Sequence, residues 1–294
     1  MFFLPNFLVA VRLRPLVEDS KGPRKNGKKS VEAWTTEEVG AMTSLTQKGY
    51  GRKVEGRTVF HFDQVFDENA PTPLVYNRIA RPMVRAVLNG KHATIFAYGQ
   101  TGSGKTFTMQ GGGEIGNGKA GIIQLVATDL FRIMHEGKIP KREFGVKVSY
   151  FEIYNEKILD LLSPRDVETL SDSYRSNRSD RVQIRTNAQG EIVVNVEQKT
   201  VTNVEEALEL LVQGNHHRTV AATDMNAHSS RSHSVFRITV ESRRTDEQQP
   251  LEDQGHGIIR VSDFNLVDLA GSESLKATNA TGTRQREGAT INKR

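Results

Sequence analysis

Apolar runs of strand length alternate along the chain with segments of helical periodicity. The strand-like runs are rich in β-branched and aromatic residues, and several alternate apolar with polar positions. They cover residues 7–13, 58–66, 93–98, 145–154, 235–242 and 258–269. This alternation predicts an α/β layered fold rather than a helical bundle or a β-sandwich.

The first helical segment has clear start and stop signals. Thr72 is its expected N-cap, Pro73 occupies the first helical position, and Asn89-Gly90 ends it. Pro82 predicts a kink. The positions expected to point inward are Leu74, Ile79, Met83 and Val87.

Two further helices are expected. Residues 121–134 repeat the apolar spacing of the first helix. The other helix begins at Asn203, with Glu206 three residues later as a capping box, and is expected to stop at Gly214. Its expected apolar face consists of Val204, Leu208, Leu211 and Val212.

Three polar, turn-rich segments lack periodicity and are predicted to be surface loops or insertions. They cover residues 18–30, 163–180 and 243–257. The basic residues of the first loop either grip an acidic partner or are merely solvated. The same two interpretations apply to the whole chain, whose net charge is +5.

Composition excludes several kinds of chemistry. The chain has no cysteine, so disulfides, zinc-thiolate sites and cysteine nucleophiles are excluded, and an intracellular compartment is expected. The apolar start lacks a basic region and contains Pro5, so we interpret it as a strand rather than a signal peptide. No later run approaches the ~18 to 20 apolar residues of a membrane-spanning helix. His228 and His233 have no companion ligands at useful spacing, which argues against zinc.

The stretch "GQTGSGKT" fits the phosphate-binding loop pattern of glycine, four residues, then glycine-lysine-threonine. Its glycines allow the backbone to close around phosphate oxygens, Lys105 would neutralise the β- and γ-phosphates, and the Thr106 hydroxyl would bind Mg²⁺. The alternative is a flexible glycine-rich turn, but the apolar run 93–98 leads directly into the loop, as the motif requires. The predicted nucleotide-binding residues are Gly99, Gln100, Thr101, Gly102, Ser103, Gly104, Lys105 and Thr106.

Two other stretches supply candidates for an acidic metal site and for contacts to the γ-phosphate. "FNLVDLAGSE" ends an apolar strand at Asp268 and continues with Gly271 and Glu273. "NAHSSRSH" places hydroxyls around Arg231, and the alternative for this stretch is a serine-rich turn before the strand at 235–242.

The order and wording of these segments resemble the kinesin motor family. The resemblance covers nearly the whole chain through "VAVRLRP", "FDQVF", "FAYGQTGSGKTFTM", "VSYFEIYNEKILDLL", "NAHSSRSH", "NLVDLAGSE" and "REGATINK". "VSYFEIYNEKI" and "HSSRSHSVFRITVES" are most similar to the centromere-associated subfamily. The resemblance implies a single P-loop NTPase domain over residues 1–294, with a central, mostly parallel β-sheet flanked by helices on both faces.

The resemblance also implies roles for individual residues. Arg12, Arg14 and Pro15 would line the adenine and ribose pocket, and Phe107 would stack on its other side. In the first switch, Ser229 and Ser230 would contact the γ-phosphate and the Mg²⁺ shell.

The second switch would complete the site. Asp268 would hold a Mg²⁺-bound water, and the Gly271 N–H would sense the γ-phosphate. Arg231 and Glu273 would form a salt bridge that closes both switches over the attacking water. The implied cofactors are ATP and Mg²⁺, and the implied activity is ATP hydrolysis coupled to movement along microtubules.

The resemblance further implies that a motor domain continues beyond Arg294, so truncation within the switch II helix region is expected, with most of the microtubule-binding surface missing. The implied partner is the microtubule, with dimerisation through a stalk outside this chain, no membrane, and a cytoplasmic location on the microtubule cytoskeleton, spindle or kinetochore. One alternative is a nucleotide-binding module that is nonmotile or inactive. Another is an ATPase that acts on nucleic acid, but the chain lacks the aromatic and basic platform that single strands need.

Overall fold

The computed structural model describes residues 7–15, 34–39, 42–47, 59–112, 119–137, 139, 142–163, 182–186, 190, 192–223, 231–245 and 259–273. The chain groups into two compact units, residues 1–79 and 80–294; the expectation of a single domain stays a prediction. The predicted loop 18–30 lies outside the described residues, as do most of 163–180 and 243–257.

The first unit consists mainly of short strands. β1 (Ala10–Arg12) pairs in parallel with β5 (Gln64–Phe66), and an antiparallel meander contains β2 (Trp34–Val39), β3 (Met42–Gln47) and β4 (Val59–Phe62). The strand predicted over 58–66 is divided at Asp63, whose carboxylate accepts a hydrogen bond from Val9 N at 2.8 Å. β2 and β3 were not predicted, because most of their residues are polar and do not alternate with apolar ones.

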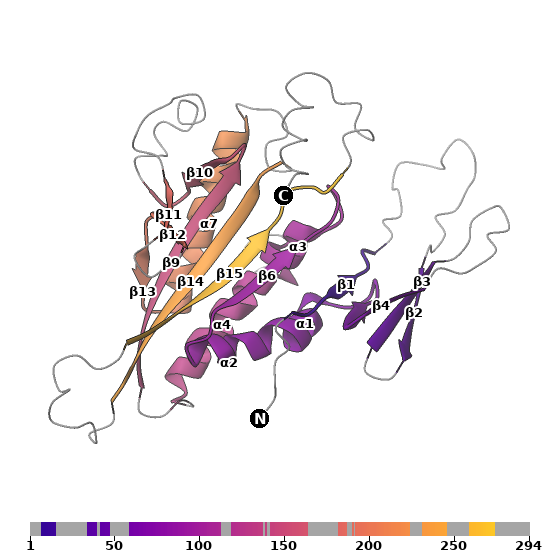
Figure 1. The fold of residues 1–294 in the computed structure, drawn as a ribbon, viewed down its shortest axis with the longest axis horizontal. Coiled ribbons are helices and arrows are strands. Elements are labelled where there is room, and N and C mark those ends of the chain that lie inside the picture. The colour runs from indigo at the N-terminus through magenta and orange to yellow at the C-terminus, as the bar shows by residue number, and fades with distance from the viewer. Residues whose placement is uncertain are drawn as a thin grey trace. The chain divides into compact units, whose positions relative to one another are not determined.

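The second unit is built on a sheet with the order β10-β9-β14-β15-β6, with β13 also paired to β9 (Figure 1). Its strands are β6 (Ala93–Ala97), β9 (Arg142–Tyr154), β10 (Lys157–Asp160), β13 (Lys199–Val201), β14 (His233–Arg244) and β15 (Ile259–Asp268). Small pairs also form between β7 (Gly111–Gly112) and β8 (Lys119–Ala120), and between β11 (Ile184–Thr186) and β12 (Ile192–Val194).

The sheet is mixed, which corrects the expectation of a mostly parallel one. Among its described strands, only β15 and β6 pair in parallel, whereas β9, β14 and β15 are antiparallel neighbours. The direction in which two neighbouring strands pair depends on the path of the connection between them, which the apolar pattern of the strands does not specify. The parallel pair carries the glycine-rich loop at the end of β6.

The first predicted helix is interrupted. It comprises α1 (Thr72–Val75), the π-helical segment η1 (Tyr76–Ala80) and α2 (Arg81–Leu88). η1 ends two residues before Pro82, which has no N–H for the helical ladder, so a widened turn stands where a kink was predicted. Pro71 is the N-cap in place of Thr72, and Leu74 is 41% exposed, not inward as predicted. Ile79 and Val87 are buried, as predicted.

Together with α2, three further helices cover the sheet of the second unit. They are α3 (Lys105–Gln110), α4 (Ile122–His135) and α7 (Val204–Thr223). α4 contacts α2, α3 and α7, so these helices form one layer; a second layer is not among the described residues. No helix in the described part of the chain is long and apolar enough to cross a membrane.

α7 confirms its predicted start but not its predicted end. Asn203 Oδ1 accepts a hydrogen bond from Glu206 N at 2.8 Å, as expected of an N-cap. The helix continues through Gly214, where a Cβ would lie 2.1 Å from the Tyr150 ring, so this glycine permits close packing instead of ending the helix. Val212 is 51% exposed, contrary to prediction. The buried stripe of α7 consists of Ala207, Leu211, Gly214 and Arg218.

Candidate nucleotide-binding site

The glycine-rich loop follows β6 and ends where α3 begins at Lys105. Gly102 and Gly104 have φ angles of 78° and 98°, a left-handed backbone that residues with side chains rarely adopt. A Cβ at Gly99 would lie 2.6 Å from Ser103 Oγ. The loop therefore needs its glycines, and it leads into a helix N-terminus, where backbone N–H groups have no partner within the helix.

The side chain of Lys105 lies against this loop. Its Nζ donates hydrogen bonds to the carbonyl oxygens of Gly99 at 2.8 Å and Gln100 at 3.0 Å. Phosphate oxygens carry more negative charge than carbonyl oxygens and form stronger hydrogen bonds with an ammonium group. A phosphate in the loop would therefore compete well for Lys105.

Thr106 and Asp268 join α3 to the end of β15. Thr106 Oγ1 donates to Asp268 Oδ2 at 2.6 Å. Asp268 is 4% exposed, and its other oxygen, Oδ1, has no hydrogen-bond partner among the described residues. A buried carboxylate oxygen without a partner is costly, and a hydroxyl beside a carboxylate suits the oxygen preference of Mg²⁺. These residues therefore fit a magnesium site of the kind predicted.

The segment after β15 runs beside the glycine-rich loop. Ser272 N donates to Gly99 O at 3.1 Å, and the Glu273 carboxylate accepts from both the N–H, at 2.8 Å, and the hydroxyl of Thr101. Partial burial works to raise the pKa of Glu273, but the hydrogen bonds from Thr101 outweigh it and lower the pKa below its usual range. Glu273 therefore stays ionised at neutral pH.

Gly271 occupies a position where a side chain has no room. A Cβ there would lie 2.3 Å from Glu273 Oε2 and 2.4 Å from Thr101 Oγ1. The backbone at Gly271 thus lies close to the phosphate-binding loop, as a residue that contacts the γ-phosphate requires. The structure brings together the loop, Asp268, Gly271 and Glu273.

The predictions for the first switch and for Phe107 stay predictions. Ser229 and Ser230 lie outside the described residues, and Arg231 comes just before β14. The predicted salt bridge between Arg231 and Glu273 remains a prediction. Phe107, in the first turns of α3, is 38% exposed, as a side chain available for stacking would be.

Three of the residues predicted at the adenine, Arg12, Arg14 and Pro15, belong to the first unit. Arg12 donates to Thr72 Oγ1 at 3.2 Å and to Ala70 O at 3.0 Å, and burial lowers its pKa. Arg14 and Pro15 are exposed. Their predicted place at the nucleotide stays a prediction.

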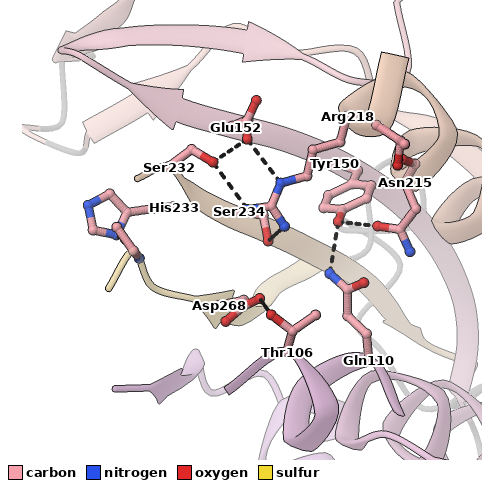
Figure 2. A network of polar contacts seen from close by, with 12 residues as sticks. Thr106, Gln110, Tyr150, Glu152, Asn215, Arg218, Ser232, His233, Ser234 and Asp268 are labelled. Atoms are coloured by element: carbon pink, nitrogen blue, oxygen red, sulfur yellow. Dashed lines mark hydrogen bonds and ion pairs between the residues drawn. The ribbon is translucent and has the colours of Figure 1, made fainter. Parts of the chain in front are cut away.

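Sequence reasoning missed a buried polar group beside the site (Figure 2). Glu152 on β9 accepts from Arg218 Nε at 2.9 Å and from the Ser232 hydroxyl, and Arg218 Nη2 donates to Ser232 Oγ at 3.1 Å. His233 Nδ1 accepts from Ala270 N at 3.1 Å. A signal was available: Glu152 shares one face of its strand with Val148 and Tyr150, so its carboxylate was due to be buried.

Tyr150 forms a second arm of this group. Its hydroxyl donates to Asn215 Oδ1 at 2.7 Å and accepts from Gln110 Nε2 at 3.2 Å. Burial raises the pKa of Tyr150 above its usual range, so the hydroxyl remains protonated. This arm joins the end of α3 to α7 (Figure 2).

A glycine-rich loop between a strand and a helix, with a threonine bonded to an aspartate at the end of the adjacent parallel strand, defines the P-loop class of nucleotide-binding folds. The family model described as the kinesin motor domain matches residues 12–294. The chain therefore belongs to the kinesin motor domain family.

Individual relatives agree with this assignment. The chain is 37% identical over 288 residues to the kinesin-like protein KIN-7E, chloroplastic, of Oryza sativa subsp. japonica. The matched region covers 98% of this chain and 22% of that protein. The chain is 39% identical over 242 residues to centromere-associated protein E of Homo sapiens, covering 82% of this chain and 8% of that protein. The chain thus spans about a fifth or less of the length of these relatives. The narrower likeness to the centromere-associated subfamily stays a prediction.

Solved structures resemble the fold closely. A structure described as "Structure of a fast kinesin: Implications for ATPase mechanism and interactions with microtubules" superposes with a TM-score of 0.75 at 30% identity, covering 96% of this chain and 70% of that one. A kinesin structure described through mutants and "activation of the kinesin motor ATPase" gives 0.71 at 28% identity, covering 97% of this chain and 76% of that one.

Proposed function

We propose that this chain binds Mg-ATP at its glycine-rich loop and hydrolyses it as the catalytic core of a microtubule motor. The observation that carries the proposal is the hydrogen bond from Thr106 to the buried Asp268 beside Lys105, with one Asp268 oxygen lacking a partner among the described residues. Membership of the family supports ATP hydrolysis. The similar fast kinesin structure, described with an ATPase mechanism and interactions with microtubules, supports the same partner here.

The geometry of the loop and the family resemblance support the binding roles. Lys105 and the N–H groups at the start of α3 would hold the β- and γ-phosphates, and Thr106 with Asp268 and Ser230 would hold Mg²⁺. When bound, Mg²⁺ neutralises the charge that develops on the phosphate oxygens. Phe107 would stack on the base, and the roles of Arg12, Arg14 and Pro15 at the base and ribose stay predictions.

The hydrolysis roles fall on the segments beside the γ-phosphate. The Gly271 N–H would donate to it, and Ser229 would contact it from the other segment. Arg231 and Glu273 would close these segments over the attacking water, so that catalysis comes from positioning and electrostatic stabilisation. Loss of the γ-phosphate would release the Gly271 turn, and a motor converts that release into movement.

Replacement of Lys105 tests the site directly. Lys105→Ala removes an ammonium that donates charge-assisted hydrogen bonds to phosphate, so we expect affinity for Mg-ATP to fall by roughly 10- to 100-fold. Lys147→Ala is the matched control, because Lys147 pairs with Glu241 on the sheet of the same unit. Calorimetric titration measures both variants. ATP affinity that stays unchanged in Lys105→Ala would show that the loop is not the site.

Phosphate release distinguishes the remaining functions. Many-fold stimulation by microtubules supports the motor core. Nucleotide binding without such stimulation supports a nonmotile binding module, and stimulation by single-stranded DNA that weakens with salt supports an ATPase acting on nucleic acid.

A further inference from the structure

A buried ion pair lies just outside the proposed nucleotide site. Glu152 is fully buried and Arg218 is 8% exposed, and the two come from different elements, β9 and α7. Charges taken out of water incur a large desolvation cost, and apolar residues of similar volume often replace such pairs without loss of stability. Stability alone is therefore a weak explanation for this pair, and its directional hydrogen bonds point to another one.

The pair holds the start of β14 through Ser232. The Ser232 hydroxyl donates to Glu152 Oε1 and accepts from Arg218 Nη2 at 3.1 Å, so both members of the pair hold one serine. Arg218 Nη1 also approaches Ser234 Oγ at 3.4 Å. Ser232 and Ser234 are 0% and 2% exposed, so the guanidinium fixes both residues that flank His233.

His233 carries this constraint to the segment after β15. Its Nδ1 accepts the hydrogen bond from Ala270 N at 3.1 Å, and Ala270 directly precedes Gly271. On the other side of this turn, Asp268 bonds Thr106 in the phosphate-binding loop. Figure 2 shows Arg218, Ser232 and His233 together with the bonded pair of Asp268 and Thr106.

We propose that Arg218 is a positioning residue for ATP hydrolysis, which acts with Glu152 through Ser232 and His233 to fix the Ala270–Gly271 backbone. This inference rests on the proposed function. Arg218 does not reach the nucleotide; it sets where the Gly271 N–H meets the γ-phosphate. A displacement of about 1 Å at such a group costs on the order of 100-fold in rate while leaving the binding of the remaining phosphates intact.

Arg218→Lys separates positioning from charge. Lysine retains a positive charge beside Glu152, but it lacks the planar fork that serves Glu152 and Ser232 together. We expect kcat for ATP hydrolysis to fall about 10- to 100-fold, whereas Kd for Mg-ADP stays within about threefold of the original chain. A purely structural role would instead lower the melting temperature and leave kcat of the folded fraction unchanged. The matched control is Arg237→Lys, since Arg237 on β14 also uses Nε, bonding Asn265 Oδ1 at 2.8 Å.

Ser232→Ala tests the next link in the path and keeps the inference testable if Arg218→Lys fails to fold. It leaves the Arg218–Glu152 pair in place and removes only the hydroxyl, so we expect a smaller loss of kcat, about 5- to 10-fold, again without a loss of Mg-ADP affinity. The double variant Arg218→Lys, Ser232→Ala should lose no more than Arg218→Lys alone, because both substitutions break one path.

The outcomes separate this inference from the proposed function. An unmodified chain that binds but does not hydrolyse ATP overturns both. An active chain whose Arg218→Lys and Ser232→Ala variants retain normal kcat overturns the positioning role alone. A multiplicative loss in the double variant also overturns it, because the two residues would then act independently.

Discussion

β15 buries a polar side chain near each of its ends, and the two differ in how they are satisfied. Ser262, near the start, is 1% exposed, and its hydroxyl donates to Val87 O at 2.7 Å. Asp268, at the end, is 4% exposed, and one of its oxygens has no partner among the described residues. A buried polar group that is satisfied within the fold serves the fold, whereas one left without a partner points to a ligand. The two ends of one strand therefore serve different purposes.

The largest expected effect comes from removing the charge at the nucleotide end. Asp268→Asn retains an oxygen that can accept from Thr106 but removes the anionic group offered to Mg²⁺. We expect basal ATP hydrolysis to fall by ~100-fold or more, and the increase in melting temperature on adding Mg-ADP to shrink. Without nucleotide, the melting temperature should not fall, because a buried charge has been removed. Hydrolysis near the original rate would show that the Asp268 end of β15 does not serve the nucleotide.

Ser262→Ala should produce the opposite pattern. The substitution removes the buried hydrogen bond to Val87 O, and this carbonyl still accepts from Gly90 N at 2.8 Å. We expect a loss of about 1 kcal/mol in the free energy of unfolding, with basal ATP hydrolysis unchanged. Urea unfolding and a phosphate-release assay measure the two quantities. A loss of activity without a loss of stability would show that this end also serves the nucleotide.

The same contrast explains what the sequence could predict. The glycine-rich loop and Asp268 were predictable, because their chemistry depends on residues close together in sequence or at the end of one apolar run. Strands were also predictable, since runs rich in β-branched and aromatic residues indicate buried strands. They are the strands at 93–98, 145–154, 235–242 and 258–269.

The parts that were missed depend on partners far apart in sequence. Gly214 resembles a helix terminator, and only its contact with the Tyr150 ring shows why glycine is needed within α7. Arg218 and Glu152 are separated by 66 positions, so neither reveals its partner locally. The mixed sheet was missed for the same reason, because strand direction is set by how the connections return.

The smallest expected effect concerns Glu273 and pH. Because its pKa is lowered in the folded chain, Glu273 contributes stability that is fully present above its ordinary value of 4.5 and is lost as pH falls through the lowered folded value. Glu273→Gln cannot make this contribution, so the melting temperatures of the two chains should differ at pH 7 and converge as pH falls below about 4.5. Because Glu273 is partly exposed, the corresponding difference in the free energy of unfolding should stay below ~1 kcal/mol. A difference that stays constant from pH 7 into the acid range would mean that the Thr101 contact does not depend on the charge, and that the Gly271 turn is held to the loop by other bonds.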